Sequence, residues 1–481
     1  MKFFNRLLYV FPATITCAVM CSILSCSPQE ESTEHQQSEV VAKQPQEVSP
    51  QVGHTVPTQQ LDVRVRLKRI RNRGERLILG KSGQRLRITN AQDNVLLGAF
   101  SGPLEIYLAS DGWRFQETSG RGRVVLPIQS LIVRDANRQG SVSSSISIQS
   151  GKAQPPRQYP GIFRLEPLSN EGSGAWDLIN EVPIEQYLPG VLSGELYADW
   201  HQQTYEAQAI AARSYAINEI LSRIGRSHFD VESSVRSQVY QGTTTNKEAL
   251  VSVQQTHGEV LSYQGRLVPG YYASCCGGQP ALASEAIGPN PINEIAPLNG
   301  HGPPAQCYQA SVFHWTRKTT RQLVEERLRI FGKSHDKEEL ARLGQLKAIE
   351  VKSVNPFGRA RSMVISDQQG RAIEISAAQL RRALMRGDSE GGQASLQLLS
   401  ENIRIKVDGD LIGIEGWGFG HGVGLCQYGA QAMARAGQEA HAIVEFYYPG
   451  VLIMKAYEAS ESATNESDPD EPLMPISNPS T

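Results

Sequence analysis

The chain has 481 residues, a length sufficient for about two to four ordinary domains and a sizeable buried core. Hydrophobic residues make up 40% of it and charged residues 20%, and 47 Lys and Arg stand against 49 Asp and Glu, a formal net charge of −2. This composition favours no single fold class, and it argues against a nucleic-acid partner, which normally requires a basic excess or patch.

The first 26 residues have the layout of a secretory signal. Lys2 and Arg6 form a short basic region before a mostly apolar run from Leu7 to Leu24. The run ends in Ile-Leu-Ser-Cys at Cys26, which resembles the lipobox at which bacterial lipoproteins are cleaved, the cysteine then carrying the lipid. The alternative is an uncleaved membrane anchor, because a run of this length is marginal for spanning a bilayer. Both interpretations predict an exported protein, anchored to a membrane in the periplasm or cell envelope.

The segment 27–60 is predicted to be a disordered tether between this anchor and the folded body. It is rich in Gln, Glu, Ser, Pro and Val without a usable period, and such a composition cannot bury enough apolar surface to offset the entropy of ordering. The tail 456–481 is similar, being rich in Ser, Pro and acidic residues, and is also predicted to be disordered.

Short strands are predicted from 61 to 159. Apolar or alternating runs such as Asp62–Leu67, Glu75–Leu79 and Val124–Leu126 are separated by Gly, Asp and Asn, which is the pattern of a β-rich module.

The region 160–455 mixes helices with strands. Tyr205–Leu221 carries an apolar stripe at helical spacing, and Glu206 and Arg213 lie off that stripe. Two further strands and a short helix are predicted, at 348–352, 362–365 and 377–385. The expected fold class is therefore α+β, a β-rich N-terminal module followed by a mixed α/β region.

Four of the seven cysteines lie beyond Cys26: Cys275, Cys276, Cys307 and Cys426. Exported compartments permit disulfides, but four cysteines in a chain of this length do not make a disulfide scaffold. We expect them to form a local feature.

Three segments of the 160–455 region are candidates for carrying chemistry. They comprise Val182–Leu196 with Tyr205–Tyr215, Ser237–Gly242 with Tyr271–Gly278, and Gly416–Ala430 with Phe446–Gly450.

The first segment contains Glu195, one acid among several nearby. One interpretation is a solvated surface residue, which is usual for glutamate. The other depends on its neighbours, because Ser193 and Gly194 leave room for a polymer to approach and Leu192 and Leu196 are apolar enough to desolvate the carboxyl group and raise its pKa.

The third segment is rich in glycine but has neither the spacing of a dinucleotide-binding loop nor that of a phosphate loop. Its glycines predict tight turns that let backbone or ligand pass close to Trp417, Phe419 and His421. Aromatic faces commonly stack on sugar rings, so a glycan groove is one interpretation. The other is a structural turn around a buried histidine.

Taken together and in this order, the three segments resemble the signature segments of the SpoIID/LytB family, which contains sporulation stage II protein D and amidase enhancers. The resemblance covers residues 160–455 and implies a lytic transglycosylase that cleaves the glycan strands of bacterial peptidoglycan. In the best-known members these strands have already lost their stem peptides.

The resemblance also implies a mechanism, with Glu195 as the catalytic residue. Glycosidic cleavage needs a proton on the leaving oxygen while oxocarbenium character develops at the anomeric carbon. A lytic transglycosylase needs no second carboxylate, because the C6 hydroxyl of the substrate closes onto the anomeric carbon and leaves a 1,6-anhydro sugar. One glutamate then serves as acid and afterwards as base.

Positions in the same segments are expected to bind substrate by family resemblance. These are Arg213, Gln238, Tyr240, Trp417, His421, Gln427 and Tyr428.

No cofactor is expected, with zinc as the alternative. Some relatives place metal ligands near the second segment, and cysteines bind zinc well, so Cys275, Cys276 and Cys307 are candidate ligands. A disulfide between Cys276 and Cys307 is equally reasonable in an exported protein.

Two other functions compete with the transglycosylase. The first is a non-catalytic wall-binding protein that stimulates an N-acetylmuramoyl-L-alanine amidase, a role held by some members of the family. The second is a β-rich adhesin or scaffold, which would explain 61–159 but not the three segments.

Overall fold

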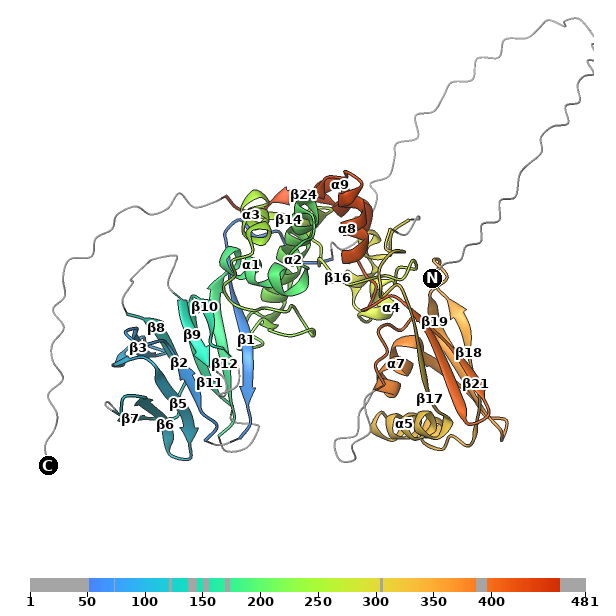
Figure 1. Cartoon of the computed structure of the whole chain (residues 1–481), viewed down its shortest axis with the longest axis horizontal. Helices are drawn as coiled ribbons and strands as arrows, with labels where there is room; N and C mark the ends of the chain where they lie inside the picture. Colours follow the sequence, from blue (N-terminus) through green and yellow to red (C-terminus); the bar gives the residue numbers. More distant parts are fainter. Residues whose placement is uncertain are drawn as a thin grey trace, which may run out of the picture. The chain divides into compact units, whose positions relative to one another are not determined.

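The structure, a computed structural model, describes residues 52–458 apart from short internal stretches (Figure 1). The stretches left out are 73, 121–122, 137–144, 150–154, 169–173, 303–305 and 386–395. The predicted signal with Cys26, most of the predicted tether and nearly all of the predicted tail lie outside the described residues. Within the described part of the chain, no helix is both long enough and apolar enough to cross a membrane.

Two sheets form the N-terminal part of the described chain. A seven-stranded sheet has the order β13-β1-β12-β11-β8-β3-β4, and a six-stranded sheet has the order β10-β9-β2-β5-β6-β7. Val63 and Val65 of β1 are buried, as are Leu104 and Ile106 of β5, because alternate side chains of a strand point to the same face. The bounds are β1 (Asp62–Ile70), β2 (Leu77–Leu79), β3 (Arg85–Asn90), β4 (Leu96–Ser101), β5 (Leu104–Ala109), β6 (Gly112–Glu117), β7 (Arg123–Leu126), β8 (Leu131–Asp135), β9 (Ser145–Gln149), β10 (Arg157–Pro160), β11 (Ile162–Pro167), β12 (Trp176–Pro183) and β13 (Val231–Glu232).

Aromatic side chains join the buried faces of these two sheets. Trp113 of β6 meets Trp176 of β12 edge-on with ring centroids 5.1 Å apart, and Phe115 of β6 stacks on Phe100 of β4 at 6.0 Å. Each pair takes one ring from each sheet, so the sheets share one core. Aromatic pairs of this kind stabilise by about 0.5–1.5 kcal/mol beyond the area they bury.

The strand-rich part extends beyond residue 159, where the sequence pattern placed its end. β11 and β12 pair with each other, and β12 also pairs antiparallel with β1 along the whole of that strand. Two central strands of the seven-stranded sheet therefore come from the segment assigned to the following region. Local alternation cannot reveal this, because the pairing joins residues more than a hundred positions apart.

The end of the predicted tether is attached to the body. The backbone carbonyl of His54 accepts a hydrogen bond from Leu267 N at 2.9 Å, and His54 Nε2 lies 2.9 Å from Ser222 Oγ. Thr55 forms a β-bridge with Arg266. Residues 54 and 55 are thus held by segments far along the chain. The folded body therefore begins before residue 60, where the sequence pattern placed the end of the tether.

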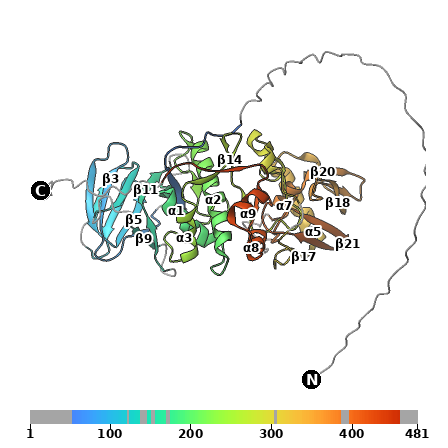
Figure 2. The ribbon, with the colours of Figure 1, turned by 90° about the horizontal axis from the view of Figure 1, so that it is seen from above.

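Helices surround α2 (Gln202–Arg223), which contains the predicted helix 205–221. It contacts α1 (Ile184–Glu195), α3 (Lys247–Gln255), α8 (Gln427–Arg435) and α9 (Ala440–Tyr447) (Figure 2). Covered in this way, α2 buries residues on almost all sides, Arg213 included. Short strands complete this part: β14 (Glu259–Tyr263), β15 (Arg266–Leu267), β16 (Tyr272–Ala273), β23 (Leu425–Cys426) and β24 (Leu452–Lys455).

The segment between β16 and β23 forms two three-stranded sheets with a core of their own, which includes Leu328, Met363, Leu380 and Ile414. The predicted strands lie in β18 and β19, and the predicted helix 377–385 is α7, so these predictions are confirmed. The elements are α4 (Ala283–Ala286), η1 (Pro291–Glu294), η2 (Ala296–Leu298), β17 (His314–Thr320), α5 (Arg321–Ser334), α6 (Glu338–Ala341), β18 (Leu346–Val354), β19 (Ala360–Asp367), β20 (Ala372–Ser376), α7 (Ala377–Met385), β21 (Ile403–Asp408) and β22 (Leu411–Trp417). The described chain contains both sheets and helices and has a strand-rich N-terminal part, which confirms the predicted α+β class.

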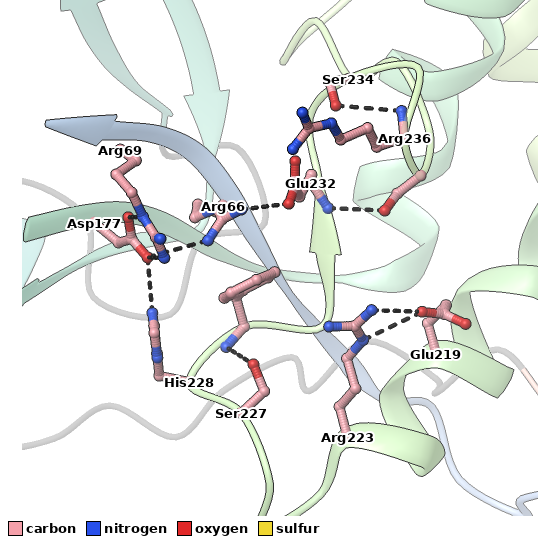
Figure 3. Close-up of polar contacts among 12 residues, drawn as sticks. Arg66, Arg69, Asp177, Glu219, Arg223, Ser227, His228, Glu232, Ser234 and Arg236 are labelled. Atoms are coloured by element: carbon pink, nitrogen blue, oxygen red, sulfur yellow. Dashed lines mark hydrogen bonds and ion pairs between the residues drawn. The ribbon is translucent and has the colours of Figure 1, made fainter. Parts of the chain in front are cut away.

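A buried carboxylate, Asp177 of β12, ties β1 to the segment after α2 (Figure 3). It accepts hydrogen bonds from Arg69 Nε at 2.8 Å and Arg69 Nη2 at 2.9 Å, and it lies 2.8 Å from His228 Nε2. Arg66 lies 3.5 Å away and also pairs with Glu232 of β13. Burial alone would raise the pKa of Asp177, but the hydrogen bonds from Arg69 and His228 and the charges of both arginines outweigh it and hold that pKa far below its ordinary value.

Candidate functional site

A groove of about 660 Å³ is lined by residues from all three sequence segments that were singled out. Its walls come from the end of α1 with the loop that follows it, one side of α2, the loop after β13, and the residues around β16 and β23. This volume lies in the range of ordinary small-ligand sites. Segments more than two hundred residues apart thus meet around one space.

Glu195 is the last residue of α1 and lines this groove. The helix ends there because Leu196 is extended, with φ −114° and ψ 153°. Gly194 lets α1 approach the segment after β13 closely, since a Cβ at this position would lie 2.5 Å from the carbonyl oxygen of Val239. The room expected beside Gly194 is therefore filled by the protein's own backbone, and a polymer must approach from the other side.

The carboxylate of Glu195 is half-buried, and its Oε1 accepts a hydrogen bond from Val239 N at 2.8 Å. Burial raises the pKa of Glu195, while the Val239 amide, Gln427 and Tyr272 lower it, and the net shift is upward. A carboxyl group with a raised pKa keeps its proton closer to neutral pH, as a general acid requires.

Two buried donors lie beside this carboxylate. Tyr272 Oη and Gln427 Nε2 both act on Glu195, but neither makes a hydrogen bond of ordinary geometry in the structure. Because buried polar groups are nearly always paired, these two donors suit a polar ligand in the groove. Tyr272 was not among the candidate residues, although it lies in the second sequence segment.

His421 lines the groove as well. Its Nδ1 accepts a hydrogen bond from Val423 N at 3.0 Å, so the proton of the neutral ring is on Nε2. Burial, together with the charge of Arg359, lowers the pKa of His421 to about 4. The ring is therefore uncharged at neutral pH and braces the glycine-rich turn.

Aromatic rings gather at the Tyr428 end of the groove. The ring centroids of Trp200 and Tyr428 are 5.1 Å apart, and those of Tyr197 and Tyr428 are 6.3 Å apart. Tyr197 and Phe419 are exposed, at 59% and 42%. Rings with one open face can stack on sugar rings. Sequence reasoning missed Tyr197 and Trp200, whose only signal was their position two and five residues after Glu195.

Trp417, by contrast, does not line this groove. It borders a second cavity of about 460 Å³, and the guanidinium carbon of Arg404 lies 5.3 Å from the centroid of its ring. The expected contact of Trp417 with the same ligand as Glu195 is not supported by its position.

Three other expected substrate-binding residues are buried and do not line the groove, namely Arg213, Gln238 and Tyr240. Arg213 forms a two-pronged ion pair with Glu185 of α1, with Nε to Oε1 at 2.8 Å and Nη2 to Oε2 at 2.9 Å. Gln238 donates to the carbonyl of Ala212, and Tyr240 Oη lies 3.1 Å from Asn180 Oδ1. Their polar groups are already hydrogen-bonded inside the protein. These residues therefore connect α1, α2 and β12 to their neighbours and have a structural role.

A second carboxylate in the groove, Glu219 of α2, was missed. Its pKa is raised by burial, against the opposing effect of Arg223, whose Nε donates to Glu219 Oε2 at 3.2 Å. Its only sequence signal is its position one turn after Tyr215, which also lines the groove.

The four cysteines within the described residues, Cys275, Cys276, Cys307 and Cys426, are buried free thiols. Cys276 Sγ and Cys307 Sγ are 3.5 Å apart, well beyond the roughly 2.05 Å of a disulfide bond, so the alternative pairing is not formed. Cys426, which was not a candidate ligand, joins the same cluster.

Comparison with known proteins supports the family resemblance that the three sequence segments carry. Residues 172–263 match the Stage II sporulation protein (SpoIID) family, and residues 302–424 match a domain of unknown function. The first match includes Glu195. The second spans the two three-stranded sheets and most of the glycine-rich turn.

Relatives were found in several bacteria. An uncharacterised protein of Brachyspira hyodysenteriae is 31% identical over 280 residues, which is 58% of this chain and 68% of the relative. The amidase enhancer of Bacillus subtilis is 26% identical over 55% of this chain and 40% of its own length. Stage II sporulation protein D of Bacillus amyloliquefaciens is 24% identical over 69% of this chain and 91% of its own length. With its three segments around one groove, the chain belongs to the SpoIID/LytB family.

Proposed function

We propose that this protein is a lytic transglycosylase that cleaves the glycan strands of peptidoglycan, with Glu195 as general acid and then general base. The observation that carries the proposal is the raised pKa of Glu195 on the wall of a groove lined with open aromatic rings and unpaired donors. The family relationship and the names of the relatives support a role at the cell wall.

The reaction begins with protonated Glu195 giving its proton to the glycosidic oxygen, while positive charge develops at the anomeric carbon. The bond between that carbon and the leaving oxygen breaks. The C6 hydroxyl of the same sugar then attacks the anomeric carbon, and ionised Glu195 takes up the hydroxyl proton. The products are a 1,6-anhydro end and a free hydroxyl end, and the enzyme regains its starting protonation state.

The neighbouring residues bind and orient the strand. Tyr272 Oη and Gln427 Nε2 donate to sugar oxygens near the reacting bond, and Tyr428 and Phe419 stack on sugar rings. The proposed substrate is the strand without stem peptides.

Glu195→Gln tests the proposal, because glutamine keeps the shape of the side chain but cannot transfer the proton. The variant should bind glycan strands yet release almost no 1,6-anhydro product, a loss of at least about 10²–10⁴-fold. The measurement is mass spectrometry of products from purified peptide-free strands.

Glu219→Gln is the matched control, since it removes a second buried carboxyl group from the same groove. It should keep 1,6-anhydro release within a small factor of wild type. Reducing ends without the anhydro ring, together with loss of activity in Glu219→Gln, would show instead a hydrolase that uses both carboxylates.

Stimulation of an amidase is the second candidate function, because one relative is named an amidase enhancer. It predicts that Glu195→Gln accelerates a purified cell-wall amidase as well as wild type does, with no 1,6-anhydro product from either protein.

Export and lipid anchoring at Cys26 complete the proposal. Metabolic labelling with a lipid analogue should mark the wild-type protein and not Cys26→Ala. Equal labelling of the two proteins contradicts the anchor.

A further inference from the structure

The three-stranded sheet β17-β22-β21 leaves one of its faces open to solvent. Its other face carries Ile412 and Ile414 of β22 into the core of this part of the chain. Opposite residues of an antiparallel pair project on the same side, so the register of the strands shows which side chains are neighbours on the open face. Trp417, which does not line the groove, is the last residue of β22 on this face. The proposed cleavage reaction makes no use of this face.

An open strip along β22 is bordered by two lysines. Gly413 is opposite Lys318 of β17 and also opposite Lys406 of β21. A Cβ added to Gly413 would meet nothing within 4 Å, so the space above the strand is open. Both lysines are exposed, and neither forms an ion pair with another described residue. The strip is therefore bare backbone between two cations.

A third cation lies at the Trp417 end of the strip. The guanidinium carbon of Arg404 is 5.3 Å from the centroid of the Trp417 ring, and this group has no carboxylate partner among the described residues. The carboxylate between Trp417 and Gly413 on this face is that of Glu415, which lies 2.8 Å from His314 Nε2. Three cations thus outnumber one carboxylate along the described strip, in a chain whose formal net charge is −2. A local excess of positive charge attracts anions.

A cavity of about 460 Å³ continues the strip beyond Trp417. Two of its apolar lining residues, Val351 and Val354, are exposed, at 39% and 54%. Gln279 also lines the cavity, and its Oε1 accepts a hydrogen bond from Asn402 Nδ2 at 2.8 Å, which leaves the NH₂ group of Gln279 as a donor. Apolar walls with a few oriented polar groups are typical of sites that bind a small ligand or one unit of a polymer.

We propose that this face of the β17-β22-β21 sheet binds an anionic glycan strand, at a site separate from the groove of Glu195. Trp417 and the apolar cavity walls pack against one sugar ring. Arg404, Lys318 and Lys406 pair with carboxylates of the sugars that follow along the strand. A flexible phosphate polymer would also pair with the cations, but it has no ring to place against the indole, so the combination of groups favours a glycan.

The two sites can act on the same long strand. From Trp417 to Gly413, β22 spans about 14 Å, which is more than the length of one sugar unit. Phe419, two residues after Trp417, lines the groove, so both sites adjoin the same glycine-rich turn. A protein with two binding sites holds a long strand more tightly than either site does alone. The face therefore keeps the protein on the strand between cleavages; this retention rests on the proposed function, whereas binding itself does not.

Binding of long, purified peptide-free strands to the full chain carrying Glu195→Gln tests the site without cleavage. In that background Lys318→Gln with Lys406→Gln should weaken binding about tenfold, the loss expected for two exposed charge contacts. Lys318→Arg with Lys406→Arg keeps both charges and should bind normally. Lys81→Gln, which removes an exposed lysine after β2, is the control and should also bind normally. Amidation of the carboxylates on the strands should abolish the difference between the double glutamine variant and its parent.

Three results would overturn the site: equal binding of long strands by the double glutamine variant and its parent, a difference that persists on amidated strands, or tighter lysine-dependent binding of polyphosphate than of glycan. Thermal unfolding should show that these exposed substitutions leave the fold intact. In the chain with Glu195, short fragments that reach only the groove should be cleaved equally with and without the two lysines. A protein that releases no 1,6-anhydro product but shows the tenfold loss contradicts the proposed cleavage and supports the second site.

Discussion

At the scale of single residues, the burial of Glu195 favours its role as a general acid but lowers the stability of the folded protein. A general acid must keep its proton near neutral pH, and burial of the carboxyl group provides this by raising its pKa, against the opposing effects of Val239, Gln427 and Tyr272. The same burial makes the ionised form costly, so at high pH this residue lowers the stability of the folded protein.

Glu195→Gln should therefore be more stable than wild type at neutral and higher pH. Because the folded-state pKa is raised, the folded protein binds the proton more tightly than the unfolded chain. Wild-type stability is then lost as pH rises from the ordinary carboxyl range, near about pH 4, through the folded-state pKa. Urea unfolding at a series of pH values measures the gain of the variant, which should vanish in acid.

Glu445→Gln on the exposed face of α9 serves as the control and should show no such pH-dependent gain. A gain for Glu195→Gln that is largest in acid, or no gain at any pH, would contradict the origin assigned to the shift.

At the scale of elements, α1 positions the carboxylate by close contact with the segment after β13. A Cβ on Gly190 would lie 2.1 Å from the carbonyl oxygen of Gly242, and a Cβ on Gly194 would lie 2.5 Å from that of Val239. Both contacts are with backbone, which cannot rotate away. The two glycines therefore set how near the helix comes to Val239, which donates to Glu195.

Gly190→Ala should destabilise the protein by about 1–3 kcal/mol, the usual cost of overpacking, even though alanine favours helix by up to about 1 kcal/mol over glycine. Thermal unfolding measures it. Gly413→Ala in β22 is the control, because nothing lies within 4 Å of its added Cβ. Equal stability of Gly190→Ala and wild type would mean that the helix shifts freely.

At the scale of the whole described chain, the Asp177 network joins the strand-rich part to the helical part. Arg66 and Arg69 come from β1, Asp177 from β12 and His228 from the segment after α2. Asp177 is fully buried, while both arginines keep some contact with solvent. Removing its charge leaves two cations facing a neutral side chain.

Asp177→Asn should destabilise by about 2–4 kcal/mol at neutral pH, somewhat below the 3–5 kcal/mol of a fully buried pair because the arginines are partly hydrated. Since the folded-state pKa is depressed, the carboxylate stabilises above its ordinary pKa, and this is lost as pH falls below about 4. Denaturant unfolding should show the two proteins converging in acid. Glu105→Gln, which breaks a more exposed pair with Arg76, should change little.

Local patterns were sufficient for individual elements. The helix at 377–385 and the strands around 349 and 364 follow from periodicity, because each buries one face against a nearby core. Patterns could not place β12 with β1, since that pairing is a long-range choice among many apolar strands.

The sequence by itself determined the family, the α+β class and the segments that line the groove. Only the tertiary structure decided which side chains face it. Arg213 and Glu219 lie on the same helix, yet Arg213 is paired with Glu185 inside the protein and Glu219 lines the groove. Likewise Cys426 joins Cys275 and Cys307 although far apart in sequence. The physical reason is that a helix covered on almost all sides lacks a continuous polar face from which its orientation could be predicted. Its orientation depends instead on the elements that pack around it.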